Sequence, residues 1–229
     1  MSQLIACQWQ GGLVMAADRR VETRRGGERD VHTVRKLFPL GPQAAVATSG
    51  AAVGIWVSRV LSRLFRQRGT LPLQELESYA LSVFQKEYGQ FVQQGARWFA
   101  AHPEALRRSY VLLGGRRGDG GYRFRFHASE EHGDPYHPLG ATRVLTAPRR
   151  LGLEGRLAQA AGTNQPDGDT LLDLVLSGLR QIAAHDEAVA APFDVVALTP
   201  QGVRWRVFDE PPAAPLVHIL DSGKTTEPG

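Results

Sequence analysis

GLVMAADRR (Gly12–Arg20), VRKLF (Val34–Phe38) and AVATSG (Ala45–Gly50) are the three segments that decide the fold. Each contains an apolar run of strand length; the first run ends at an acid, the second adjoins a base, and the third stops at a glycine. The pair Gly11-Gly12 separates two apolar runs and predicts a hairpin of Leu4–Trp9 with Leu13–Ala17. We therefore expect the first residues of the chain to lie inside a sheet, close to Asp18 and Lys36. A reactive N-terminus is one reason to place them there.

Length and composition favour one domain with a sizeable core, which we place at residues 1–208. The chain has 229 residues, of which 42% are hydrophobic and 22% charged, and such a length usually buries one core. Residues 209–229 are proline-rich and lack periodicity, so we expect a loosely ordered tail. The single cysteine, Cys7, excludes an intramolecular disulfide and favours a reducing compartment. In its apolar strand Cys7 is expected to be a small buried hydrophobe.

No apolar run approaches the length of a membrane span, and no signal peptide is visible at the N-terminus. We therefore expect a cytoplasmic protein without membrane partners.

The formal net charge is +4, and arginines concentrate between Arg19 and Arg35. Acids interrupt these bases, and no aromatic residue lies between Trp9 and Phe38. A nucleic-acid surface is usually a basic face with exposed aromatic side chains, so the pattern favours a solvated loop over nucleic-acid binding.

Hydrophobic periodicity predicts the remaining elements and a chain order of strands, two helices, strands, one or two helices, and strands. The expected helices are Ala51–Gln67, Leu73–Phe99, Leu151–Ala161 and Thr170–His185, and the expected strands are Ser109–Gly115, Gly121–His127, Arg143–Thr146, Phe193–Leu198 and Val203–Phe208. This order predicts an α+β protein.

Two polar segments could carry chemistry of another kind. The glycine-rich run 114–121 could cradle a phosphate, but a strand follows it instead of a helix, so a hairpin turn is the better interpretation. His127, His132 and His137 are spaced by five, with the acids of the polar segment 130–138 between them, and could bind a metal. Their spacing of five suits neither a helix face nor a strand face, so we expect a loop, with no metal and no cofactor.

The motifs in Gly12–Gly50 resemble the start of a proteasome β-type subunit, including the bacterial homologues of the proteasome. That family begins its mature chain with a nucleophile and continues into a strand of the pattern G-(V/L)-V-(L/M)-A-(A/T)-D-x-R. A lysine before Leu-Phe follows, and then an apolar strand ending in Ser-Gly or Ala-Gly. Asp18 follows Ser2 by 18 − 2 = 16 positions and Gly50 follows Lys36 by 50 − 36 = 14 positions, which are the family spacings. The resemblance covers roughly the first 100 residues and resumes near residues 185–205.

The resemblance implies the four-layer αββα sandwich of N-terminal-nucleophile hydrolases and a peptidase that acts on polypeptides. It also implies a homo-oligomeric ring or double ring, and it does not specify an unfoldase partner.

The resemblance also assigns roles to individual residues. Ser2, freed by removal of Met1, would be the nucleophile, with its own α-amine as base. Lys36 would lower the pKa values of that amine and hydroxyl, and Asp18 would orient Lys36. The N–H of Gly50 would stabilise the oxyanion, and Asp186 would match a second acid. The pocket for the substrate side chain would include Val21, Thr48 and Ser49, which are small and uncharged and predict acceptance of apolar side chains and rejection of acidic ones.

The sequence departs from the family pattern at several places, including extra residues between Asp18 and Lys36. Serine stands where the family usually has threonine at the N-terminus. Val189 and Ala190 replace a serine and a glycine after Asp186, and Leu139–Thr142 is the nearest match to the family's G-S-G segment. Two alternatives therefore stay open: a non-catalytic ring or scaffold protein, and an amide hydrolase or transferase for small substrates on the same fold.

Overall fold

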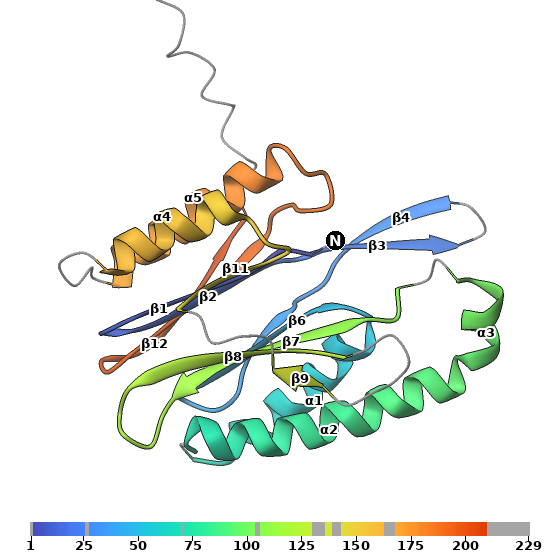
Figure 1. Cartoon of the computed structure of the whole chain (residues 1–229), viewed down its shortest axis with the longest axis horizontal. Coiled ribbons are helices and arrows are strands. Elements are labelled where there is room, and N and C mark those ends of the chain that lie inside the picture. The colour runs from blue at the N-terminus through green and yellow to red at the C-terminus, as the bar shows by residue number, and fades with distance from the viewer. Residues whose placement is uncertain are drawn as a thin grey trace, which may run out of the picture.

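The computed structural model describes residues 2–25, 28–69, 71–103, 106–129, 136–138, 143–162 and 168–209. These residues form an α+β protein with antiparallel sheets (Figure 1), which confirms the predicted class. The helices are α1 (Val53–Arg66), α2 (Leu73–Gln94), α3 (Ala96–Ala101), α4 (Leu151–Gly162) and α5 (Gly168–Ala183). The strands are β1 (Leu4–Trp9), β2 (Gly12–Asp18), β3 (Arg20–Arg25), β4 (Glu28–Thr33), β5 (Leu37–Pro39), β6 (Ala44–Gly50), β7 (Ser109–Arg116), β8 (Tyr122–Ala128), β9 (His137–Pro138), β10 (Val144–Ala147), β11 (Phe193–Thr199) and β12 (Gly202–Phe208).

The first sheet has the strand order β10-β1-β2-β11-β12 in the described residues. Its centre is the predicted N-terminal hairpin, in which Leu4 pairs with Ala17 and Trp9 with Gly12. Gly12 is required at the turn because a Cβ there would lie 2.3 Å from the carbonyl oxygen of Leu198. The hairpin thus brings the start of the chain beside the end of β2, as the sequence predicts.

The second sheet has the order β5-β6-β7-β8-β9 in the described residues and faces the first. Gly114 of β7 marks their contact, because a Cβ there would lie 2.3 Å from the Met15 sulfur and 2.5 Å from Leu13 Cδ2. The predicted glycine-rich turn between β7 and β8 is confirmed: Arg116 pairs with Tyr122 across it.

Three apolar clusters separate the layers. One lies between the first sheet and the pair α4–α5, a second lies between the two sheets, and a third lies between the second sheet and the pair α1–α2. Alternation along β1 produces this division, since Leu4 and Ala6 face the other sheet whereas Ile5 and Cys7 face the helices. Figure 1 shows α4 and α5 above the sheets and α1 and α2 below them.

The arginine-rich region does not form the predicted solvated loop. β3 and β4 form a two-stranded hairpin in which Arg20 pairs with Thr33 and Glu22 with Val31. An ion pair of 2.8 Å joins Arg29 Nε to Glu22 Oε2 across the strands, and β-branched residues in both strands favour extended backbone. Much of the hairpin is exposed, so no apolar alternation indicated it.

Other boundaries differ in smaller ways. The long helix predicted to end near Phe99 breaks at Gly95, and the short helix α3 begins at the next residue. The predicted tail from residue 210 lies outside the described residues, as do His132 and residues 139–142. At the end of the predicted polar loop, His137–Pro138 form the short strand β9 instead.

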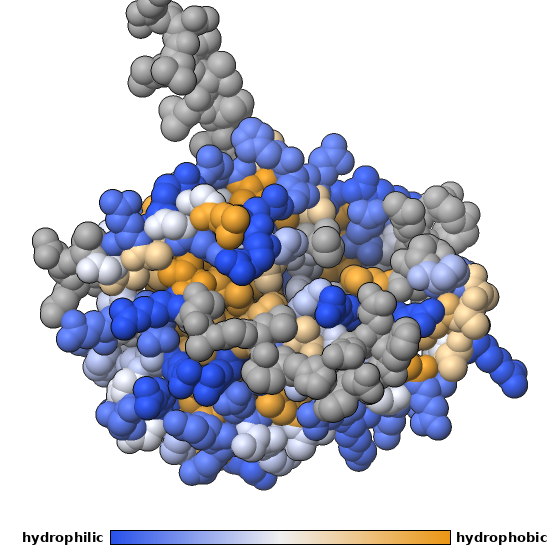
Figure 2. Space-filling view, in the orientation of Figure 1, coloured by the Kyte–Doolittle hydropathy of each residue, from blue (hydrophilic) through white to orange (hydrophobic). Residues whose placement is uncertain are grey.

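The described surface combines polar and apolar regions. The face in Figure 2 is mainly hydrophilic, with hydrophobic residues visible between the polar ones. In the part of the chain that the structure describes, no helix has both the length and the apolar character needed to cross a membrane.

Candidate active site

Asp18 ends β2 and is the centre of the candidate site. Its side chain is 0% exposed, and each of its oxygens accepts hydrogen bonds. Oδ1 accepts the backbone N–H of Gln3 at 2.7 Å, and Oδ2 accepts the backbone N–H of Arg20 at 2.9 Å. Burial raises the pKa of Asp18, and the charge and hydrogen bond of Lys36 together with these two N–H donors offset part of that rise.

Lys36 is held against Asp18. Its side chain is 1% exposed, and Nζ donates to Asp18 Oδ2 at 2.9 Å and to the carbonyl oxygen of Arg20. The Lys36 carbonyl accepts the N–H of Thr48 at 3.0 Å, which fixes its backbone to β6. Burial lowers the pKa of Lys36, and Asp18 opposes that shift. A buried lysine with a lowered pKa is suited to proton-transfer or electrostatic roles at a reaction centre.

Gln3 connects this pair to the start of the chain. Its N–H bonds Asp18 Oδ1, and its carbonyl accepts the Asp18 N–H at 3.3 Å. The amide nitrogen of Gln3 is also the atom bonded to the carbonyl carbon of Ser2. Ser2, which is half-buried, is therefore one residue from the Asp18–Lys36 pair, as the sequence predicts.

A second set of contacts, which the sequence did not reveal, leads from Gln3 to Asp186. Arg150 Nε donates to Gln3 Oε1 at 3.3 Å, and Arg150 Nη2 donates to Asp186 Oδ2 at 2.5 Å. The N–H of Ala188 donates to Asp186 Oδ1 at 3.1 Å. Burial alone raises the pKa of Asp186, but the Ala188 bond and the hydrogen bond and charge of Arg150 outweigh it and hold the pKa below its ordinary value. Asp186 therefore belongs to the same connected network as Asp18, through Arg150 and Gln3.

Gly50 ends β6 with a φ of +85°, a conformation that favours glycine. A Cβ at this position would lie 2.2 Å from the carbonyl oxygen of Arg108. The residue is therefore specified by the backbone turn from β6 toward α1, and this structural requirement exists whether or not its N–H binds an oxyanion.

The three residues expected to bind substrate differ in accessibility. Val21, in β3, and Ser49, in β6, are half-buried. Thr48 is 0% exposed. A Cβ added to Gly54 of α1 would lie 3.2 Å from the Thr48 Cβ and 3.5 Å from its Cγ2. Thr48 thus packs under α1 and offers no open surface, while the pocket assignment of all three residues stays a prediction.

Val189, at the position where the family that the sequence resembles has a serine, is part of the core between the first sheet and α5. It is 1% exposed, and its N–H donates to the Asp186 carbonyl at 2.9 Å. No hydroxyl is available at this position to hold an N-terminal amine.

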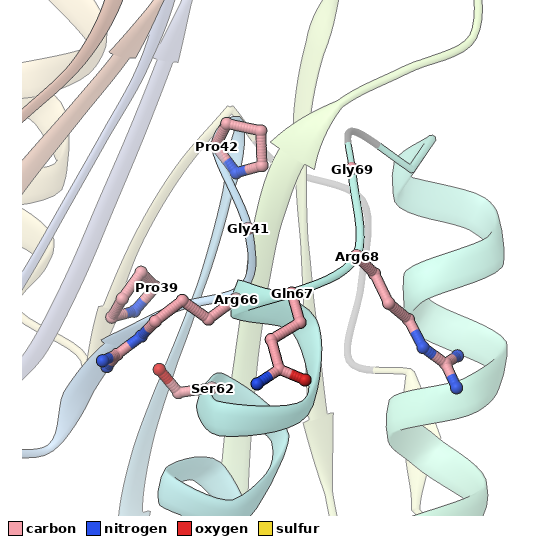
Figure 3. A pocket seen from close by; sticks show the side chains of 8 residues that line it. All are labelled: Pro39, Gly41, Pro42, Ser62, Arg66, Gln67, Arg68 and Gly69. Atoms are coloured by element: carbon pink, nitrogen blue, oxygen red, sulfur yellow. The ribbon is translucent and has the colours of Figure 1, made fainter.

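A separate cavity of about 440 Å³ lies at the C-terminal end of α1 (Figure 3). None of the candidate residues lines it; its lining residues are Pro39, Gly41, Pro42, Ser62, Arg66, Gln67, Arg68 and Gly69. Among the described residues, no group of three or more histidine, cysteine or acidic side chains is placed to hold a metal ion.

Comparisons with known proteins place no further constraint on the site. No protein-family model matches the chain, and a search of curated proteins finds no match.

Proposed function

We propose that the protein is a proteasome-like peptidase of the N-terminal-nucleophile class, with the αββα sandwich of that class. Its nucleophile is Ser2 after removal of Met1. The observation that carries this proposal is the position of Asp18, whose two oxygens bind Lys36 Nζ and the backbone N–H of the residue after Ser2.

In the proposed reaction, the Ser2 hydroxyl attacks the carbonyl carbon of a substrate peptide bond, and the Ser2 α-amine accepts its proton. The reference pKa of an α-amine, about 8, suits this transfer near neutral pH. The Lys36 charge lowers the pKa of both groups, and Asp18 keeps Lys36 oriented. The N–H of Gly50 stabilises the negative oxygen of the tetrahedral intermediate. Collapse transfers the proton to the leaving amine and forms an ester at Ser2, which water then hydrolyses.

A free α-amine is the feature that distinguishes this mechanism from ordinary serine catalysis. Peptide turnover should be lost in Ser2→Ala, and also in a protein that carries one uncleaved extra residue before Ser2. A matched protein with the extra residue at its C-terminus should retain the wild-type rate. Full activity of the N-terminally extended protein would reject the amine as base.

We further propose that copies of the chain assemble into a ring or double ring through the α1–α2 layer. This layer carries three large apolar side chains that are open to such a contact: Trp56 and Leu64 of α1 and Tyr79 of α2 are 53%, 42% and 39% exposed. A monomer by light scattering at micromolar concentration would reject the assembly.

The buried Val189 favours a second candidate function, a non-catalytic ring or scaffold protein on the same fold. Its lost hydroxyl removes a group that the family uses beside the N-terminal amine. A chain with a free Ser2 that cleaves no peptide would support this alternative.

A further inference from the structure

The segment before β1 is clamped from two sides by contacts of Gln3. Its backbone N–H and carbonyl bond Asp18, on the side of Lys36. Its side chain reaches the other way: Nε2 donates to the carbonyls of Leu4 and Pro148, each at 3.1 Å, and Oε1 accepts Arg150 Nε at 3.3 Å. Gln3 is 0% exposed, so these contacts decide where the peptide bond to Ser2 lies.

The backbone of Arg150 is held in place by hydrogen bonds to β10 and the first turn of α4. Its N–H donates to Thr146 Oγ1 at 2.6 Å, and that hydroxyl donates to Glu154 Oε1 at 2.8 Å. Glu154 also accepts the N–H of Thr146 and the guanidinium of Arg149. The start of α4 is therefore locked to β10, the strand that pairs with β1.

The guanidinium of Arg150 joins two parts of the site that are far apart in the sequence. One nitrogen contacts Gln3, and another contacts Asp186, whose carboxylate is also bound by the N–H of Ala188. Val189 carries no hydroxyl, so within the described residues the Arg150 guanidinium connects the turn at Asp186 to the start of the chain.

We propose that Arg150 is a positioning residue for the N-terminal nucleophile, acting through Gln3 and held by Asp186. This role rests on the proposed function. Arg150 touches neither Ser2 nor the substrate in this account; it restricts where the Ser2 hydroxyl and amine lie relative to Lys36.

The first test compares the steady-state kinetics of Arg150→Ala with those of the wild type. A small displacement of a reacting group lowers the rate by about 100-fold, so kcat should fall by about that factor while KM stays within about twofold. Arg156→Ala is the matched control, because Arg156 is also in the α4 region but pairs with Gln181 on the surface. A kcat for Arg150→Ala within twofold of wild type, or an equal loss in Arg156→Ala, would overturn the role.

Two further variants keep the test decisive if Arg150→Ala folds poorly. Arg150→Lys retains the charge but not the two separately directed nitrogens, and its kcat should lie between those of Arg150→Ala and the wild type. Gln3→Met keeps the side-chain length and removes the acceptor, so it should reproduce the loss in kcat. If Arg150 acts through Gln3, the double variant should be no slower than the slower single variant. Multiplied losses, or a wild-type kcat in both Arg150→Lys and Gln3→Met, would overturn the role.

The failure of this inference can be distinguished from the failure of the proposed function. An active wild type, an inactive Ser2→Ala and an unaffected Arg150→Ala would reject the positioning role alone. A wild type with a free Ser2 that shows no turnover would reject the peptidase and, with it, the role of Arg150.

Discussion

Replacing Lys36 by methionine tests the buried ion pair at the centre of the site. The substitution keeps a long unbranched side chain but removes the ammonium group that bonds Asp18 at 2.9 Å. Breaking a buried pair from one side costs about 3–5 kcal/mol, because the other charge is left buried without its partner. Asp18 still accepts two backbone N–H groups in this variant, so we expect the lower end, about 3 kcal/mol, at neutral pH.

The pH dependence of this loss identifies its cause. Burial raises the pKa of Asp18 even with Lys36 present, and removing Lys36 raises it further. A carboxyl with a raised folded-state pKa binds its proton more tightly in the folded protein. Protonated Asp18 therefore contributes its full stabilisation of the folded protein below the unfolded pKa of about 3.9. That stabilisation is lost as pH rises through the folded-state pKa. The free energy of unfolding lost in Lys36→Met should accordingly be small in acid and grow toward neutral pH.

The assay is urea unfolding of wild type, Lys36→Met, Asp18→Asn and the double variant at several pH values. The double variant buries no unpaired charge, so the cycle should give a coupling of about 1–3 kcal/mol and no growing deficit with pH. Lys86→Met is the control, since Lys86 is exposed on α2 and should change stability by less than about 0.5 kcal/mol. An equally small change for Lys36→Met at neutral pH would refute the buried pair.

Three further predictions concern other residues of the protein. Gly50→Ala should lower the free energy of unfolding by at least about 2 kcal/mol in thermal melts, because of the positive φ and the contact with the Arg108 carbonyl. The control is Gly89→Ala in α2, where a Cβ meets nothing within 4 Å; it should be neutral or stabilising. Burial raises the pKa of Glu154, but the hydrogen bonds from Arg149 and Thr146 outweigh that effect and hold the pKa below its ordinary value. Glu154→Gln should therefore lower the free energy of unfolding above the unfolded pKa of about 4.3 and match wild type in urea titrations well below it. An equal loss of stability at all pH values would contradict this. A peptide library should show cleavage after apolar residues, whereas preferred cleavage after acidic ones would reject the assignment of Val21, Thr48 and Ser49.

The parts of the fold that the sequence predicts are those with local signals. Gly11-Gly12 between two apolar runs predicted the β1–β2 hairpin, and helical periodicity predicted α1, α4 and α5, because these features depend on neighbours in sequence. The β3–β4 hairpin has two largely exposed faces and thus lacked the apolar alternation from which strands are recognised.

Only part of the candidate site could be predicted from the sequence. Asp18 and Lys36 were proposed from a motif resemblance, and their contact, 18 positions apart, follows from the hairpin and the return of the chain through β5. The bond between Gln3 and Arg150 spans 147 positions, and no spacing rule indicates a pair so distant. The burial of Thr48 under α1 also required the structure, since the face of β6 that meets the helices depends on the register of the whole sheet.

Covalent labelling of Ser2 tests the central claim most directly. The purified protein is treated with a peptide carrying a vinyl sulfone, an electrophile that an activated hydroxyl can attack, and the intact mass and the modified residue are determined by mass spectrometry. We expect a chain lacking Met1 with a single adduct at Ser2, and no adduct in Lys36→Met protein that remains folded. Retention of Met1, or an unlabelled free Ser2 in the wild type, would contradict it.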